Sequence, residues 1–287
     1  MMKLNQSSRQ GFVLLTTLLI LAIAGVLSIG LVRHSLNLAT TATRAERELQ
    51  TKWGSISCNR FARIERARLL TENRIEDGEE VESQLTSAEM DFNLGGQEFY
   101  VLLQDESAKL NINHSYRHAG RESTVSAVRN FSGGRLPVQL RPLRLRNRTA
   151  MENDFESWGQ VFELDDVGDL APEQLIAATT NLTFWGQGIN LHLASDKVIQ
   201  QTVAPLVGAT MAFRLLEIRE DGGLEDWQEQ LAAAGAREDG LNTLARIART
   251  SSSAYSVWVV NRSSHRTSAS FSAIENVSDS VTRIRSF

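Results

Sequence analysis

Two groups of side chains in this 287-residue chain have types and spacing that could bind a metal ion. His114 and His118 are four residues apart, so on a helix both imidazoles would lie on one face, as zinc ligands can. No H-E-x-x-H pattern surrounds them, and the residues between them add no acid. Asp165, Asp166 and Asp169 offer oxygen ligands without completing a calcium-binding loop. We therefore expect a solvated acidic turn and no cofactor, with a bound calcium ion as the alternative.

Motifs for other chemistry are missing. The sequence has no G-x-S-x-G, no phosphate-binding loop and no dinucleotide fingerprint, and Gly186-Gln187-Gly188 is expected to be a turn. Cys58 is the only cysteine, which excludes an intramolecular disulfide and a cysteine-based zinc site. The net charge of −4 gives no basic field, and the arginines at 141–148 have no aromatic residues among them. We expect a protein that is not an enzyme and does not bind nucleic acid.

Two polar stretches remain, "LQDESAKLNIN" at 103–113 and "NLTFWGQGINLHLAS" at 181–195. Each places charged or amide side chains among apolar ones. The simplest interpretation is a turn leading into a short strand, with asparagine side chains bonding to the backbone. These stretches must be positioned by the elements that flank them.

Strands are expected before the first stretch. Ala88–Leu94 and Gln97–Gln104 are separated by Gly95-Gly96, a pattern that predicts a β-hairpin. Every residue from Phe99 to Leu103 is apolar or aromatic, so the second strand should be largely buried.

The C-terminal third is expected to be helical and then extended. Residues 196–250 have a helical pattern, Ala254–Ile274 should form a last hairpin, and the polar tail from Glu275 should be loose. Three breaks are predicted within the helical part, at Pro205, at Gly222-Gly223 and at 235–240.

The N-terminal segment Phe12–Val32 contains no charge and no proline. A helix of roughly 21 residues is about 30 Å long, enough to cross a hydrocarbon core. Lys3 and Arg9 precede it and no acid occurs before Arg33, which favours a cytoplasmic N-terminus. A cleaved secretory signal, with Ala22-Ile23-Ala24 as its cleavage site, would leave a mature chain that begins with apolar residues. A plain membrane anchor is the other general interpretation.

The helical pattern continues to about Asn73, and 76–80 should be a loop. We expect this second half to pack against the domain through an apolar face, although two helices with a break near 39–43 would give the same pattern. The residues predicted for that face are Leu49, Trp53, Ile56, Ile64 and Ala67, with Phe61 at its edge.

Arg9-Gln10-Gly11-Phe12 resembles the class III signal of type IV pilins and type II secretion pseudopilins. The resemblance implies cleavage by prepilin peptidase between Gly11 and Phe12, followed by methylation of Phe12. Most members carry Glu at the fifth mature position, where this chain has Thr16. That glutamate is thought to pair with the N-terminal amine of a neighbouring subunit, and a buried carboxylate without a partner is costly. Its loss is typical of the K-type minor pseudopilin, which lies at the tip.

The two polar stretches are similar to structural motifs of the same family. The first matches a D-E-x-x-K-h-N-h-N pattern, where h is apolar. The second keeps the asparagine and alanine of an N-h-N-x-A pattern, with His192 in place of its second asparagine. By resemblance, the motif residues are Asp105, Glu106, Lys109, Asn111, Asn113, Asn190 and Ala194.

The resemblance implies an α+β, pilin-like fold, in which a long N-terminal helix packs on an antiparallel sheet and a helical domain is inserted. The family pattern also implies a D-W-h-D-x-D stretch in the insertion, which this chain lacks. The expected domains are a leader peptide at 1–11, a transmembrane helix at 12–32, a pilin-like helix with the first strands at 33–113, an inserted α-domain at 114–180, and a return strand, helices and final hairpin at 181–287.

The implied function is assembly. A K-type minor pseudopilin is a single-pass inner-membrane protein with a periplasmic body, and it reaches the tip of the type II secretion pseudopilus. The implied partners are the I-type and J-type minor pseudopilins, the inner-membrane assembly platform and prepilin peptidase. Two alternatives remain: a minor pilin of a type IV pilus, acting in adhesion or DNA uptake, and a membrane-anchored periplasmic binding protein.

Overall fold

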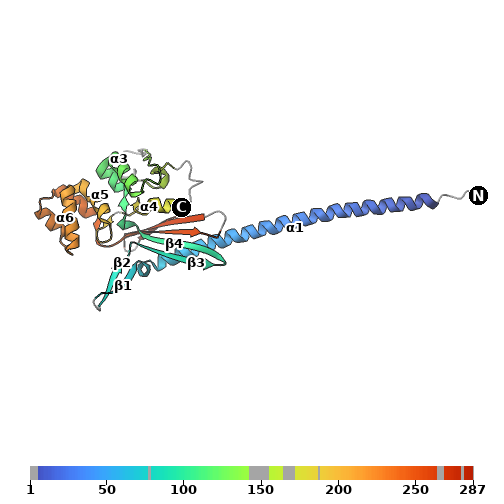
Figure 1. Ribbon diagram of the computed structural model, residues 1–287, viewed down its shortest axis with the longest axis horizontal. Helices are drawn as coiled ribbons and strands as arrows, with labels where there is room; N and C mark the ends of the chain where they lie inside the picture. Colours follow the sequence, from blue (N-terminus) through green and yellow to red (C-terminus); the bar gives the residue numbers. More distant parts are fainter. Residues whose placement is uncertain are drawn as a thin grey trace, which may run out of the picture. The chain divides into compact units, whose positions relative to one another are not determined.

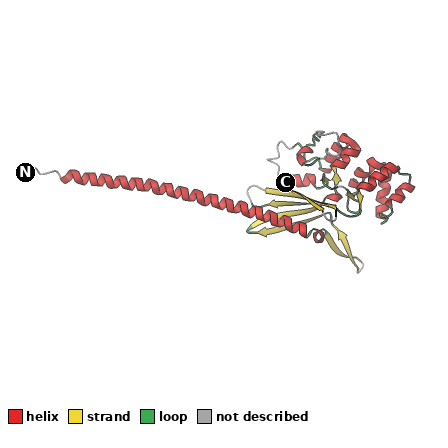
Figure 2. Ribbon diagram, turned by 180° about the vertical axis from the view of Figure 1, so that it is seen from behind, coloured by secondary structure: helices red, strands yellow, loops and turns green. Residues whose placement is uncertain are grey.

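A 59-residue helix, α1 (Gln6–Ile64), opens the described part of the chain (Figures 1 and 2). The computed structural model describes residues 6–76, 79–141, 155–163, 172–186, 188–263, 268–278 and 281–286. Two compact units, Met1–Trp53 and Gly54–Phe287, divide within α1. The α+β fold class is confirmed, since the last turns of this helix pack on an antiparallel sheet.

The main sheet has five antiparallel strands in the order β11-β10-β9-β4-β3. Gly95 and Gly96 join β3 to β4 with positive φ angles of 61° and 76°, as a tight hairpin turn needs. Both predicted hairpins are confirmed. The tail is not loose as predicted, because β11 pairs with β10 and satisfies its backbone hydrogen bonds there. The strands are β3 (Ser87–Leu94), β4 (Gln97–Asp105), β9 (Ala254–Asn261), β10 (Ser268–Ser278) and β11 (Val281–Ser286).

The last turns of α1 cover one face of this sheet. Gly54, Cys58 and Ala62 recur every four residues and are buried. A methyl group added at Gly54 would lie 2.2 Å from the Phe99 ring, so the helix backbone comes close to the strand there. We call this packing the α1 contact. It joins the helix to a set of buried strand residues: Phe99, Val101, Leu103, Val257, Val259 and Ile274.

The apolar face predicted for this packing is the wrong one. Trp53 is 64% exposed, and Leu49, Ile56 and Ile64 are exposed as well. Large side chains on β4 already fill the space above the sheet, so the helix can approach only through small residues. Burial raises the pKa of the Cys58 thiol in this contact.

The helix also ends earlier than predicted. After Ile64 come the short helix α2 (Arg66–Leu69) and two paired strands, β1 (Thr71–Glu76) and β2 (Glu79–Gln84), where a helix end near Asn73 and a loop at 76–80 were expected. Antiparallel pairing gives this polar stretch backbone partners that a loop would lack. The Asp-Gly pair at 77–78 is a hairpin signal that the sequence interpretation missed.

Helices cover the other face of the sheet (Figure 1). Leu102, Trp258 and Phe271 from the sheet share one core with residues of the helices, among them Ile112, Ile199 and Leu215. The helices are α3 (Ile112–Phe131), α4 (Pro172–Thr179), α5 (Asp196–Val207), α6 (Ala209–Glu220), α7 (Trp227–Ala233) and α8 (Glu238–Ile247), with the 3-10 turns η1 (Glu106–Ala108) and η2 (Trp158–Gln160).

Two details differ from the sequence prediction. Pro205 lies inside α5, and the break comes at Gly208, whose φ of 93° favours glycine. The stretch at 181–195 does not return to the main sheet. It forms two-residue parallel pairs instead, β6 (Leu182–Thr183) with β5 (Leu110–Asn111) and β7 (Ile189–Asn190) with β8 (Ala248–Arg249).

Candidate functional site

The first candidate region is the N-terminal part of α1. Within the described residues, α1 is the one helix long and apolar enough to cross a membrane, a criterion that a signal sequence also meets. The Thr16, Thr17 and Ser28 hydroxyls donate to backbone carbonyls three or four residues earlier, at 2.8 Å each. The helix therefore satisfies these polar groups by itself, as an apolar environment requires. The backbone of Gly11 and Phe12 lies within α1, and their cleavage and methylation stay predictions.

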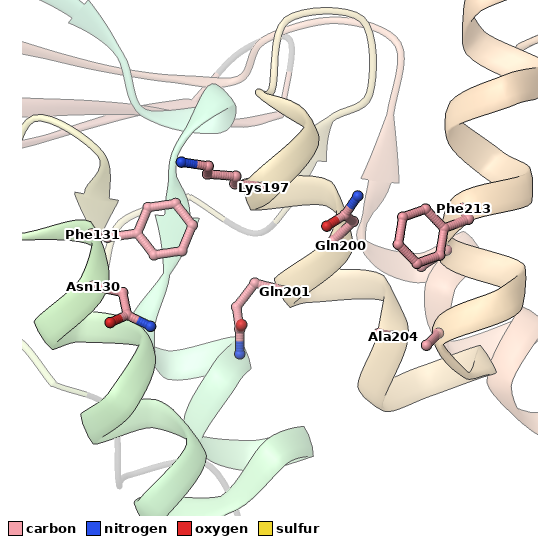
Figure 3. Close-up of a pocket in the computed structure, with 9 residues that line it drawn as sticks. Asn130, Phe131, Lys197, Gln200, Gln201, Ala204 and Phe213 are labelled. Carbon is pink, nitrogen blue, oxygen red and sulfur yellow. The ribbon is translucent and has the colours of Figure 1, made fainter.

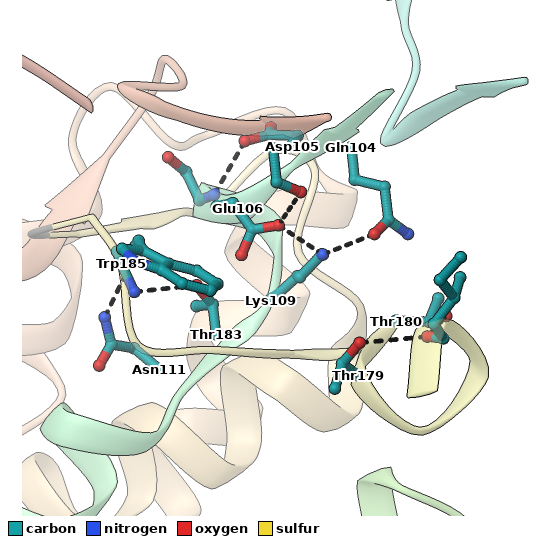
Figure 4. A network of polar contacts seen from close by, with 12 residues as sticks. Gln104, Asp105, Glu106, Lys109, Asn111, Thr179, Thr180, Thr183 and Trp185 are labelled. Atoms are coloured by element: carbon teal, nitrogen blue, oxygen red, sulfur yellow. Dashed lines mark hydrogen bonds and ion pairs between the residues drawn. The ribbon is translucent and has the colours of Figure 1, made fainter. Parts of the chain in front are cut away.

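The second candidate region begins where β4 ends (Figure 4). Asp105 caps η1 by accepting a hydrogen bond from the Ser107 backbone N–H at 2.8 Å. Glu106 Oε1 accepts from Lys109 Nζ at 2.5 Å, and the same ammonium donates to Gln104 Oε1 at 2.9 Å. The Ser256 hydroxyl also donates to Glu106. Both carboxylates and the ammonium are almost completely buried.

Burial dominates the electrostatics at this point. The pKa of Asp105 is raised to about 6, mainly by burial and to a smaller extent by the neighbouring Glu106. Hydrogen bonds from Ser252 and Ser107 and the charge of Lys109 oppose this rise. Glu106 Oε2 is buried and has no hydrogen-bond partner among the described residues. The Lys109 ammonium thus pairs with Glu106, and Asp105 is a second carboxylate in the same buried site, an arrangement that favours proton uptake by Asp105.

The two asparagines of the first stretch fasten loops to the start of α3. Asn111 caps α3 by accepting from the His114 N–H at 3.1 Å, and its amide donates to the carbonyls of Trp185 and Gly186. Asn113 accepts from the Phe155 N–H at 2.7 Å and donates to the carbonyls of Phe155 and Phe184. Each buried amide therefore satisfies backbone groups that lie 42 to 75 residues away.

Asn190 brings the second stretch to the same place. Its side chain accepts from the His192 N–H at 3.0 Å and donates to the Ser252 hydroxyl at 2.8 Å. The Ser252 hydroxyl in turn donates to Asp105 Oδ2. The backbone carbonyl of Ala194, itself buried, accepts from Arg219 at 2.7 Å.

The structure thus brings the two predicted motif stretches together, and the Ala194 backbone N–H donates to the carbonyl of Asn190 at 2.9 Å. We call Asp105, Glu106, Lys109, Asn111, Asn113, Asn190 and Ser252 the polar cluster. Ser252 and Ser256 were not predicted. The only sequence signal was the run of serines at 251–253 before a buried strand, where a hydroxyl needs a partner.

No metal centre emerges from the described residues. They contain no group of three or more His, Cys, Asp or Glu placed to hold an ion. The His114 and His118 rings make an edge contact with centroids 6.4 Å apart. Asp165, Asp166 and Asp169 lie outside the described residues, so the calcium alternative stays a prediction.

Comparison with solved structures finds chains of similar backbone arrangement. No protein-family model and no curated protein matches the chain. Among solved structures, one chain of the crystal structure of the GspK-GspI-GspJ complex from the enterotoxigenic Escherichia coli type 2 secretion system is similar. The match covers 85% of this chain and 99% of that chain, with 13% sequence identity and a TM-score of 0.48. At this identity the similarity is one of backbone arrangement.

Proposed function

We propose that this chain is a minor pseudopilin of the K type, which assembles at the tip of a type II secretion pseudopilus and does not act as an enzyme. The observation that carries the proposal is the meeting of the two motif stretches: Asp105 and Asn190, 85 positions apart in the sequence, share the Ser252 hydroxyl. The Gly11-Phe12 signal at the start of the apolar segment supports the same family resemblance.

The proposed life cycle begins in the inner membrane. Phe12–Val32 spans the bilayer with the N-terminus in the cytoplasm and the body in the periplasm, because the basic residues Lys3 and Arg9 precede the apolar run. Prepilin peptidase removes residues 1–11 and methylates Phe12. The assembly platform then extracts the subunit together with the I-type and J-type minor pseudopilins.

Thr16 fits the tip position in this scheme. A glutamate here would need the N-terminal amine of a subunit ahead of it, and a tip subunit has none. Thr16 instead bonds to the Val13 carbonyl of its own helix. Thr16→Glu should therefore reduce pseudopilus assembly, whereas Thr17→Glu, which also adds a carboxylate to the apolar segment, serves as the matched control for membrane insertion.

The deciding experiment is the mass and N-terminal sequence of the mature protein from its native host. A chain that begins with methylated Phe12 supports the proposal. A start near Gly25 would indicate a secreted protein, and an intact Met1 would indicate a plain anchor. Gly11→Ala or a larger residue should block trimming, while Gly25→Ala, where an added methyl group meets nothing within 4 Å, should be trimmed normally.

A further inference from the structure

An aromatic cavity of about 320 Å³ opens beside the polar cluster, between η2, α4 and the sheet. Four buried rings, those of Phe184, Trp185, Trp258 and Phe271, lie along its wall, and Trp158 adds a fifth that is partly buried. Sites for small organic ligands have this size and this largely apolar lining.

The five rings form one continuous group. Centroid distances are 4.6 Å from Trp158 to Phe184, 3.9 Å from Phe184 to Trp185 and 4.7 Å from Trp185 to Phe271. The ring planes of Trp158 and Trp185 stand at 80° to each other. The other neighbouring pairs are inclined by 30° to 63°, so the rings do not form a flat stack. Aromatic ring faces carry negative charge density, so a wall built from five rings can attract a cation.

The described residues that line this cavity carry charge of one sign. Glu156, an exposed residue, lines the cavity, and no Lys, Arg or His of the described chain does so. Ring faces and a carboxylate both attract a cation, and the apolar wall favours one that holds little water. The lining is therefore complementary to an ammonium group that is covered by methyl groups.

A second cavity, of about 500 Å³, has the opposite character (Figure 3). It lies between the end of α3 and helices α5 and α6, and Lys197 is its one charged lining residue in the described chain. Amide side chains and the exposed ring of Phe213 complete much of its lining. This cavity should not attract a cation, so it offers a control within the same protein.

We propose that the aromatic cavity binds a small quaternary ammonium compound, with the methylated nitrogen against the rings and Glu156 as the counter-charge. This binding is independent of the proposed assembly function, so either one can fail alone.

The test is isothermal titration calorimetry of the full chain in a sugar-headed, uncharged detergent, with choline as the probe. The matched ligand is 3,3-dimethyl-1-butanol, which has the same shape and no charge. We expect saturable choline binding that is about tenfold tighter than that of the neutral compound. Equal affinities would overturn the proposal, as would the absence of saturable choline binding.

Variants locate the binding. Glu156→Gln, at an exposed position that should not affect folding, should weaken choline about threefold and leave the neutral compound unchanged. Ala269→Trp, at an exposed position that lines the cavity, should abolish binding of choline and of the neutral compound. Phe213→Ser in the second cavity should change neither, and a loss of choline binding there would contradict the assignment. Glycerophosphocholine shows whether the natural ligand is a phospholipid head group or a free compound. Binding as tight as that of choline indicates a phospholipid head group, and much weaker binding indicates a free compound.

Discussion

The α1 contact and the polar cluster hold the same sheet in place by different means. The α1 contact is a fit of shapes, in which Gly54, Cys58 and Ala62 let a helix lie on the large side chains of the strands. The polar cluster depends on each hydrogen-bond partner and on the charge of Asp105 and Glu106. The stability that the α1 contact provides should therefore depend on side-chain volume and not on pH. The stability that the polar cluster provides should depend on both side-chain polarity and pH.

The largest loss should come from Asn113→Ala in the polar cluster. The change leaves the Phe155 N–H and the carbonyls of Phe155 and Phe184 buried without this partner, which should lower the free energy of unfolding by about 3–5 kcal/mol. Chemical denaturation measures the loss. Asn130→Ala, at an exposed position of the same helix, should cost less than about 0.5 kcal/mol. Similar losses for both variants would show that the amide of Asn113 is not structurally important.

Asp105 should make the polar cluster sensitive to pH. Its pKa is raised to about 6 in the folded protein, above its value in the unfolded chain, so the folded state binds the proton more tightly. The stabilisation is fully present below about pH 4 and is lost as the pH rises through 6.

The measurement is the free energy of unfolding of wild type and Asp105→Asn between pH 4 and 7.5. Relative to the variant, wild type should lose about 2–3 kcal/mol over this range. Asp91→Asn is the control, because Asp91 is exposed and pairs with Arg262 at the surface. A constant difference between wild type and Asp105→Asn would contradict the raised pKa.

Gly54→Ala tests the α1 contact. Alanine normally favours a helix over glycine, but here its methyl group would overlap the Phe99 ring, so we expect a loss of about 1–3 kcal/mol that does not vary with pH. Thermal unfolding measures it, and Phe99→Leu in the same chain should recover part of the loss. Gly30→Ala has open space around it and should leave the unfolding of the body unchanged.

The smallest effect should come from an exposed position next to Gly54 on α1. Trp53→Ser changes a residue that is 64% exposed, so the free energy of unfolding should move by less than about 0.5 kcal/mol. A loss above 1 kcal/mol would mean that the tryptophan, and not the small residues, secures the helix.

Local patterns predicted much of the sheet but not the helix face. The Gly95-Gly96 turn between two strand-like segments identified one hairpin, since turn geometry is set by neighbouring residues. The buried face of α1 was predicted from its largest apolar side chains, and that rule fails where the partner surface is already full. Gly54 and Ala62 have little hydrophobicity of their own, so they gave no signal in the sequence.

The sequence by itself determined the long apolar helix, the two hairpins and the presence of two unusual polar stretches, because each depends on residues that are close along the chain. Only the tertiary structure decided that Asn190 reaches Asp105 through Ser252, and that five aromatic rings from separate segments surround one cavity. The Ser252–Asp105 hydrogen bond joins residues 147 positions apart. Such partners are selected by the burial of polar groups in a shared core, and one segment alone does not contain that information.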